Sequence, residues 1–187
     1  PRKSVIRAVR DFQRMRFIAE RNHRQHRAED LVLRQRSIRL HVGHDGRRVV
    51  EALGQIPAQA LPAGERVVWV MVPAGAVTHA VIEELGGLLG EGDLVIDGGN
   101  SYFGDDKGHA QQLGAQGIHF LDVGVSGGVW GLANGYGLMV GGDAAQVERV
   151  MPVFDALRPE GPREEGFVHA GEVGAGHYAK MVHNGIE

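Results

Sequence analysis

Apolar residues recur in short blocks along residues 66–187, and the blocks alternate between two spacings. Residues 67–72 form an unbroken apolar run, as expected of a parallel strand that is covered on both faces. Helical spacing follows in Ala80, Val81, Leu85 and Leu88. The alternation continues through strands predicted at residues 94–96, 118–122 and 138–140 and helices predicted at residues 105–116 and 145–157. This order predicts an α/β protein with a doubly wound parallel sheet.

Residues 1–65 fit this alternation less well. Val5, Val9, Phe12 and Met15 would share one face of a helix, and no strand is evident before them. Residues 38–42 alternate like a strand, and residues 47–53 could form the helix after it. We expect three parts: an atypical, poorly packed basic segment over residues 1–37, an α/β domain over residues 38–177 that is best defined from residue 66, and the start of another helix over residues 178–187.

Charge divides the chain in a similar place. Residues 1–50 carry 14 Lys and Arg against 5 Asp and Glu, whereas residues 51–187 carry 6 against 18. A basic arm on an acidic body can indicate nucleic-acid binding. This arm has only two Phe to stack on bases and no Gly/aromatic RNA-binding signature. The sequence therefore does not favour nucleic acid as a partner.

Composition narrows the class of protein further. The chain has 29 glycines, about twice the usual share, which suits the tight strand-to-helix turns of an α/β protein. It has no cysteine, so neither a disulfide framework nor a thiolate metal site is possible. The histidine spacing indicates no metal site either. No apolar run approaches membrane-spanning length. We expect a cytoplasmic protein with no membrane partner.

Four polar residues near the end of the sequence would share one helical face. Lys180, His183, Asn184 and Glu187 are spaced i, i+3, i+4 and i+7. An amine and a carboxylate on adjoining turns, with an imidazole and an amide between them, form a proton-transfer surface for a polar anionic substrate. A solvated helix end would explain one Lys and one Glu. The cluster of four polar groups and the glycines before it favour a site.

Two glycine-rich turns follow predicted strands. The turn at residues 97–101 is ordinary by composition, but it lies at the carboxyl end of a parallel strand, where open α/β sheets bind ligands. Residues 124–128 offer the Ser126 hydroxyl and bare N–H groups, which suit a carboxylate, although a flexible loop has the same composition. Asp122 before this loop and His177 before the polar helix face have the character of supporting residues.

One short motif imitates a dinucleotide fingerprint. Residues 174–179 satisfy Gly-x-Gly-x-x-Gly/Ala, but the fingerprint needs a following strand and an acidic residue about 20 positions on, and Ala179 is eight residues from the end of the sequence. We expect these glycines to let the backbone turn tightly and to bring the next helix close to the sheet. No Gly-x-Gly-x-x-Gly occurs in residues 1–65.

Five blocks in the same order resemble decarboxylating 6-phosphogluconate dehydrogenase, of the β-hydroxyacid dehydrogenase superfamily. They are Met71–Gly75, Ile96–Ser101, Gly124–Val129, Leu138–Gly142 and Lys180–Glu187. The resemblance covers about residue 66 to residue 187. It implies a Rossmann-like NAD- or NADP-binding domain, incomplete at its start, and the beginning of a catalytic helix, without the helical domain that follows in the family. It also implies 6-phosphogluconate as substrate, a place in the pentose phosphate pathway and a homo-oligomeric parent.

The resemblance implies a role for individual residues. Lys180 would be the base that takes the C3 hydroxyl proton, and Glu187 the acid that protonates the enediol. The residues implied to bind substrate are Asn100, Ser126, Gly127, Gly128, His183 and Asn184. The residues implied to contact the cofactor are Val72, Pro73, Ala74 and Asn100. No metal is implied.

Two further identities fit parts of the sequence. Sister enzymes such as 3-hydroxyisobutyrate dehydrogenase share the Ser-Gly-Gly loop and the catalytic Lys, but ordinarily lack the blocks at residues 97–101 and 183–187. A non-catalytic fragment is the other alternative. An Arg-rich start joined abruptly to residue 66 would arise from a shifted reading frame or from a lineage-specific extension.

Overall fold

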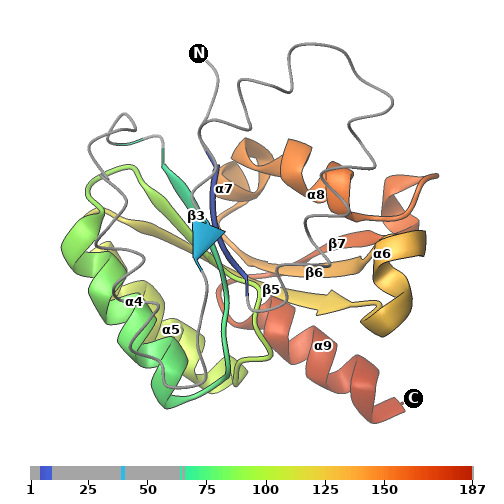
Figure 1. The fold of residues 1–187 in the computed structure, drawn as a ribbon, viewed down its shortest axis with the longest axis horizontal. Coiled ribbons are helices and arrows are strands. Elements are labelled where there is room, and N and C mark those ends of the chain that lie inside the picture. Colours follow the sequence, from blue (N-terminus) through green and yellow to red (C-terminus); the bar gives the residue numbers. More distant parts are fainter. Residues whose placement is uncertain (1–4, 10–38, 41–63, 65, 187) are drawn as a thin grey trace.

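The computed structural model describes residues 5–9, 39–40, 64 and 66–186, which form a sheet with helices on both faces (Figure 1). The strands are β1 (Val5–Val9), β2 (Arg39–Leu40), β3 (Val67–Met71), β4 (Leu94–Asp97), β5 (His119–Ser126), β6 (Gly137–Gly142) and β7 (Phe167–Gly171). The helices are α4 (Ala76–Leu88), α5 (Phe103–Gly114), α6 (Gly131–Asn134), α7 (Ala144–Arg149), α8 (Met151–Leu157) and α9 (Ala175–Ile186). Single 3₁₀ turns are η2 (Gly128–Trp130) and η3 (Arg163–Glu165).

The strand order is β2-β1-β3-β4-β5-β6-β7, and β2 through β5 run parallel. From β1 the chain moves to one side to form β2, then crosses back to form β3 on the other side. This reversal between β1 and β3 is the topological switch point of a doubly wound sheet. The predicted Rossmann-like α/β fold is confirmed.

The prediction of a wholly parallel sheet is wrong at β6, which pairs with β5 in the antiparallel direction, from Leu121 opposite Gly142 to Ser126 opposite Gly137. The connection between the two strands runs only from residue 127 to residue 136 and contains η2 and α6. Parallel strands need a crossover of a dozen or more residues, whereas antiparallel strands can be joined by a shorter segment. Strand β7, which we did not predict, then pairs parallel to β6.

The helical interpretation of Val5 and Val9 is also wrong. These residues begin and end β1, which pairs with β3 from Val5 opposite Val67 to Val9 opposite Met71. β-branched residues favour a strand, and Val5, Ile6 and Val9 are of this type. Of the strand predicted at residues 38–42, Arg39 and Leu40 form β2. The helix predicted at residues 47–53 lies outside the described residues, as does the rest of the segment 1–37.

The helix predicted at residues 145–157 forms as two helices, α7 and α8. Pro152 stands in the first turn of α8, where it requires no intrahelical N–H bond, and Val150 separates the two. The Asp143 carboxylate caps α7 by accepting hydrogen bonds from the N–H groups of Ala145 and Gln146. Among the described residues, no helix has both the length and the apolar character needed to cross a bilayer.

Each face of the sheet carries its own apolar core, because successive strand residues point to opposite sides. Helices α4 and α5 cover one face, and α7 and α8 cover the other (Figure 1). In β3, for example, Val68 and Val70 face α4 and α5, whereas Trp69 packs edge-on against Phe154 of α8. Trp69 is therefore a core residue on the α8 side of the sheet. Helix α9 contacts β5, β6, β7 and α5, and so lies beside α5.

A buried ion pair joins the amino ends of β3 and β4. The Asp93 carboxylate lies 2.5 Å from the Arg66 guanidinium and accepts hydrogen bonds from the N–H groups of Gly64, Arg66 and Gly90. Since both strands start here, this pair lies at the end of the sheet opposite the carboxyl-end loops.

Replacing Phe154 by Ala should destabilise the fold by about 3–5 kcal/mol, because the ring is fully buried against Trp69 and Phe167 and its loss leaves a cavity. The measurement is the free energy of unfolding in urea. Val168→Ala removes a half-exposed side chain and is the control, with a change within about 0.5 kcal/mol. Equal effects of the two substitutions would contradict this description of the core.

Candidate active site

Helix α9 lies in direct backbone contact with the sheet. A Cβ on Gly176 would stand 2.4 Å from the carbonyl oxygen of Met139 and 2.7 Å from that of Asp122. On the strand side, a Cβ on Gly124 would stand 2.5 Å from the Cβ of Lys180. Only glycine fits at both positions, because real side chains do not approach so closely. The expectation that glycines bring this helix close to the sheet is confirmed.

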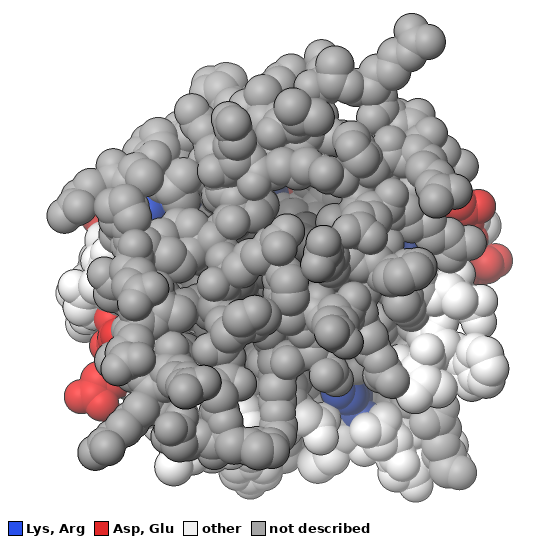
Figure 2. Space-filling view, in the orientation of Figure 1, with Lys and Arg blue, Asp and Glu red and all other residues white. Residues whose placement is uncertain are grey.

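Lys180 is half-buried on α9, directly over Gly124 of β5. Burial lowers the pKa of its amine from the ordinary value of 10.5, because the charged form loses water. Asn184, one turn further along, is exposed, His183 is half-buried, and Glu187 lies outside the described residues. On the face shown in Figure 2, basic atoms are visible at the lower right, over α9, and acidic atoms at both margins.

The predicted turn after β4 is built on a buried carboxylate. Asp97 accepts hydrogen bonds from the N–H of Gly99, at 2.9 Å, and from the hydroxyl of Ser101, at 2.7 Å. Asn100 between them is exposed. The carboxylate thus holds the turn in shape and leaves the Asn100 amide facing outward, where it is available to a ligand.

The predicted cofactor-contact residues directly follow the neighbouring strand β3. Val72 is buried, Pro73 is half-buried, and Ala74, two residues before α4, is exposed. The carbonyl oxygen of Pro73 accepts a hydrogen bond from the hydroxyl of Thr78, at 2.9 Å, which ties the strand end to the helix. Because β3 and β4 are adjacent and parallel, this segment and the Asn100 turn lie at the same edge of the sheet.

The Ser-Gly-Gly loop begins at the end of β5, the next strand in the sheet. Ser126 is half-buried, and Gly127 and Gly128 are exposed with φ values of 146° and 47°. Their conformation turns the chain sharply into η2 and leaves the loop open to solvent. Trp130 in η2 is 71% exposed. Ser126 lies two residues beyond Gly124, the residue that contacts Lys180.

A buried polar network behind Lys180 anchors the start of α9. The Asp122 carboxylate accepts hydrogen bonds from the N–H groups of Gly174, at 2.7 Å, and His177, at 2.9 Å. The His177 imidazole in turn hydrogen-bonds Asp106 of α5 through Nδ1, at 2.9 Å. Asp122 therefore occupies the anion position at the N-terminus of α9, so this glycine motif does not receive a pyrophosphate. The supporting roles expected of Asp122 and His177 agree with these contacts.

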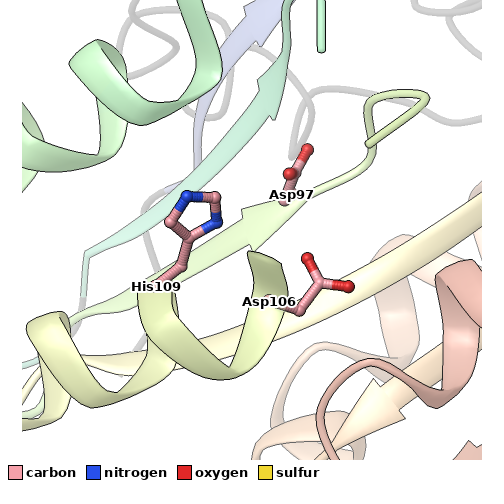
Figure 3. Close-up of side chains that lie close together, drawn as sticks. All are labelled: Asp97, Asp106 and His109. Carbon is pink, nitrogen blue, oxygen red and sulfur yellow. The ribbon is translucent and has the colours of Figure 1, made fainter. Parts of the chain in front are cut away.

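A second set of polar groups lies on α5. Figure 3 shows Asp106 and His109 on α5 beside Asp97 at the end of β4. His109 is buried and lies 2.9 Å from His79 of α4, nitrogen to nitrogen. Burial and the charge of His79 lower the pKa of His109, although Asp97 and Asp105 act in the opposite direction. The spacing of 30 residues between the histidines gives no hint of this contact.

Two groups of three side chains are close enough to share a cation, with ligand atoms within 4.8 Å of one another. They are Asp97 with Asp106 and His109, and Asp106 with Asp122 and His177. Their carboxylates already accept hydrogen bonds: both oxygens of Asp97 and of Asp122 do so, and Asp106 bonds His177. We therefore assign these groups to hydrogen bonding, and the lack of a metal stays a prediction.

Burial perturbs the protonation of the Asp106–His177 pair. Burial raises the pKa of Asp106 to about 6, even though the bond to His177 acts to lower it. Burial acts to lower the pKa of His177, but the hydrogen bond and the charge of Asp106, with the charges of Asp97 and Asp122, raise it overall. The two groups titrate as a pair that retains a proton into the neutral range.

Comparison with known proteins decides the family. Residues 18–160, more than half of the chain, match the family described as the NAD binding domain of 6-phosphogluconate dehydrogenase. The chain belongs to this family. The membership confirms the resemblance inferred from the five sequence blocks and the expected cofactor class, a nicotinamide dinucleotide.

Relatives and solved structures agree with this membership. The chain is 44% identical over 120 residues to the NAD⁺-dependent, decarboxylating 6-phosphogluconate dehydrogenase of Haloferax volcanii, covering 64% of this chain and 38% of that protein. The 6-phosphogluconate dehydrogenase structure of Plasmodium falciparum is similar at a TM-score of 0.69 and 19% identity, with 97% of this chain and 40% of that chain covered. The structure of 3-hydroxyisobutyrate dehydrogenase from Mycobacterium tuberculosis is similar at a TM-score of 0.70 and 21% identity. The match covers 100% of this chain and 60% of that chain.

The two structures establish the fold alone at these identities. The chain spans less than two fifths of the Haloferax relative, so what it shares with that protein is the dinucleotide-binding part. In the described residues, Asn100 and Ser126 lie at the ends of adjacent strands, and Lys180 lies on the helix packed on them. Their roles in binding and catalysis stay predictions. The Asp122–His177–Asp106 network was missed, and the only hint of it in the sequence was the supporting character of Asp122 and His177.

The contribution of the Asp106–His177 pair to stability should fall as pH rises from about 4 to above 6.5, whereas His109, whose pKa is lowered, acts in the opposite direction. The folded-state pKa of Asp106 is above its unfolded value, so between about pH 4 and 6 the folded state retains a proton that the unfolded chain releases. The contribution of His177, whose pKa is also raised, is lost as pH rises through its folded-state pKa. This pair should add about 1–3 kcal/mol less to the free energy of unfolding at pH 8 than at pH 5, measured in urea as the difference between the chain and its Asp106→Asn variant.

Asp106→Asn should flatten or reverse this dependence, because it removes the anion that raises the pKa of His177. Asp143→Asn is the matched control, since it removes an exposed carboxylate and retains an acceptor that caps α7. An Asp106→Asn protein with the unaltered pH dependence would show that this pair is not its source.

Proposed function

We propose that this chain is the dinucleotide-binding part of an enzyme that oxidatively decarboxylates 6-phosphogluconate. The overall reaction is 6-phosphogluconate plus NAD(P)⁺ giving ribulose 5-phosphate, CO₂ and NAD(P)H. A hydride leaves C3 of the substrate for the nicotinamide, and the C3 hydroxyl loses its proton. The resulting 3-keto acid loses CO₂, and the enediol left behind takes a proton at C1.

The single observation that carries this proposal is the position of Lys180. A half-buried amine with a lowered pKa stands over β5, two residues from the hydroxyl and bare N–H groups of the Ser126–Gly128 loop. A lysine must be neutral to accept a proton, and burial shifts its equilibrium toward that form. The arrangement therefore provides a base beside a loop suited to an anionic substrate.

The other residues take roles consistent with their placement. Ser126, Gly127 and Gly128 would hold the substrate, with Asn100 at the next strand end and His183 and Asn184 further along α9. Lys180 would take the C3 hydroxyl proton, and Glu187, which lies outside the described residues, would deliver the proton to C1. The keto acid itself accepts the electrons of decarboxylation, so the step calls for no metal.

The sheet fits the nicotinamide cofactor in part. The switch point between β1 and β3 is where doubly wound sheets bind dinucleotides, and the segment after β3 with half-buried Pro73 and exposed Ala74 adjoins it. The usual glycine turn after β1 is missing from the sequence, which has no glycine before Gly43. When bound, the cofactor would supply the hydride acceptor. Val72, Pro73, Ala74 and Asn100 are the residues of this chain that would border it.

A 3-hydroxyisobutyrate-type dehydrogenase is the second candidate, favoured by the fold shared with the Mycobacterium tuberculosis enzyme. Such an enzyme would use the same Lys180 and Ser-Gly-Gly loop on a smaller acid. The turn at residues 97–101 and the residues 183–187 favour the phosphorylated sugar acid. Measured turnover of 3-hydroxyisobutyrate with none of 6-phosphogluconate would reverse this preference.

The chain by itself should have little or no dehydrogenase activity. The glycine turn that receives a pyrophosphate is missing, and the chain spans only part of the length of its relatives. The assay is NAD(P)H formation from 6-phosphogluconate by purified chain. Turnover at a rate typical of enzymes, about 1 s⁻¹ or more, would contradict the prediction.

In the complete enzyme, Lys180→Met should abolish hydride transfer and weaken substrate binding only modestly. A base in the transition state contributes about 10²–10⁴-fold, so kcat should fall by at least that much. Glu187→Gln should instead impair protonation of the enediol and leave a partial oxidation half-reaction. Steady-state kinetics and single-turnover absorbance of NAD(P)H distinguish the two variants. Near-normal kcat in Lys180→Met would refute the assignment of the base.

A further inference from the structure

The position of Lys180 depends on how α9 lies against the sheet. Lys180 and Gly176 both contact β5 at distances that admit no larger group on the facing residue. A small rotation or withdrawal of the helix would therefore carry the amine out of its half-buried position. The contacts that hold the first turn of α9 decide whether such a movement occurs.

Those contacts are concentrated in one buried network. Asp122 of β5 accepts from two N–H groups of the first turn, which fixes the helix axis relative to the strand. The His177 side chain extends sideways to Asp106 of α5, which fixes the rotation of α9 about that axis. His177 precedes Lys180 by three residues, so the two side chains lie on the same helical face.

The network consists of fully buried ionisable side chains, which packing alone does not require. His177 and Asp106 have side chains that are 1% and 0% exposed, and Asp97 and Asp122 are also fully buried nearby. A buried ion pair adds little net stability compared with apolar residues of similar volume, but it fixes geometry. In the other buried pair, Arg66–Asp93, the same chemistry joins two strand starts far along the sheet from α9.

We propose that the Asp106–His177 bond is a positioning element that holds α9 in the rotation at which Lys180 lies buried over Gly124. Neither residue takes part in proton transfer to the substrate. The effect of this bond on catalysis rests on the proposed role of Lys180 as the base. The positioning of α9 by α5 does not depend on that role.

The titration of Lys180 in the purified chain tests this directly. The sequence contains three lysines, Lys3, Lys107 and Lys180, so a chain labelled with ¹³Cε-lysine gives a simple NMR spectrum that Lys180→Met assigns. Asp106→Ala removes the bond and should raise the Lys180 pKa toward its ordinary value of 10.5, because the amine becomes more hydrated. Loss of the Asp106 charge alone would lower that pKa, since a nearby anion favours the ammonium form.

Matched variants separate positioning from general loosening. Asp106→Asn keeps an acceptor for the His177 Nδ1–H and should not raise the Lys180 pKa. Asp93→Asn weakens the distant Arg66–Asp93 pair and should leave the Lys180 pKa unchanged. If Asp106→Ala does not fold, His177→Ala and His177→Asn form the corresponding pair, because the Asn amide retains a donor near the position of Nδ1. The proposal is supported if the Lys180 pKa rises in the Ala variant and does not rise in the corresponding Asn variant.

The positioning role would be overturned if the Lys180 pKa were unchanged or lowered in the folded Ala variants. An equal rise of the Lys180 pKa in Asp93→Asn would also overturn it. In the complete enzyme, Asp106→Ala should lower kcat by up to about 100-fold with an unaltered KM for the cofactor, since misplacement of a reacting group has effects of that size. The proposed function fails separately, if Lys180→Met retains turnover. The Lys180 titration then still decides whether the pair positions the helix.

Discussion

The close approach of α9 to β5 and β6 is the contact on which the rest of the site depends. Gly176 on the helix and Gly124 on the strand remove the two side chains that would keep the backbones apart. The helix consequently brings Lys180 to the strand end where the Ser126 loop begins. A larger residue at either glycine would move the amine away from that loop, whatever the remaining residues of the site were.

This approach carries an electrostatic cost that the network beneath it offsets. Three buried carboxylates, Asp97, Asp106 and Asp122, lie among the two buried imidazoles of His109 and His177, and isolated buried charges are strongly unfavourable. Each carboxylate accepts at least one hydrogen bond: Asp97 from its own turn, Asp122 from the start of α9, and Asp106 from His177. Asp97 therefore orders the turn after β4, and Asp122 and Asp106 fix the start of α9. These neighbouring carboxylates connect the site to the elements that support it.

The sequence predicted the parts of this fold that depend on local pattern. Val67–Met71 is unbroken in its hydrophobicity, so β3 was evident. The turn at residues 97–101 was predicted correctly at the carboxyl end of the next strand, β4. Three features depend on pairing between distant segments and escaped prediction: the strand identity of Val5–Val9, the antiparallel direction of β6, and the bond between Asp106 and His177, 71 residues apart. Helical spacing and strand spacing are hard to distinguish over a few apolar residues, and Val5 and Val9 satisfied both.

The most direct test of the account is the proximity of Lys180 to Gly124 in solution. Cross-relaxation between the α protons of Gly124 and the β protons of Lys180 can be measured by NMR in the purified chain. A strong cross-peak is predicted, because a Cβ on Gly124 would stand 2.5 Å from the Lys180 Cβ. If assigned signals of the two residues gave no cross-peak, α9 would not lie on β5 as described, and the placement of the base would be contradicted.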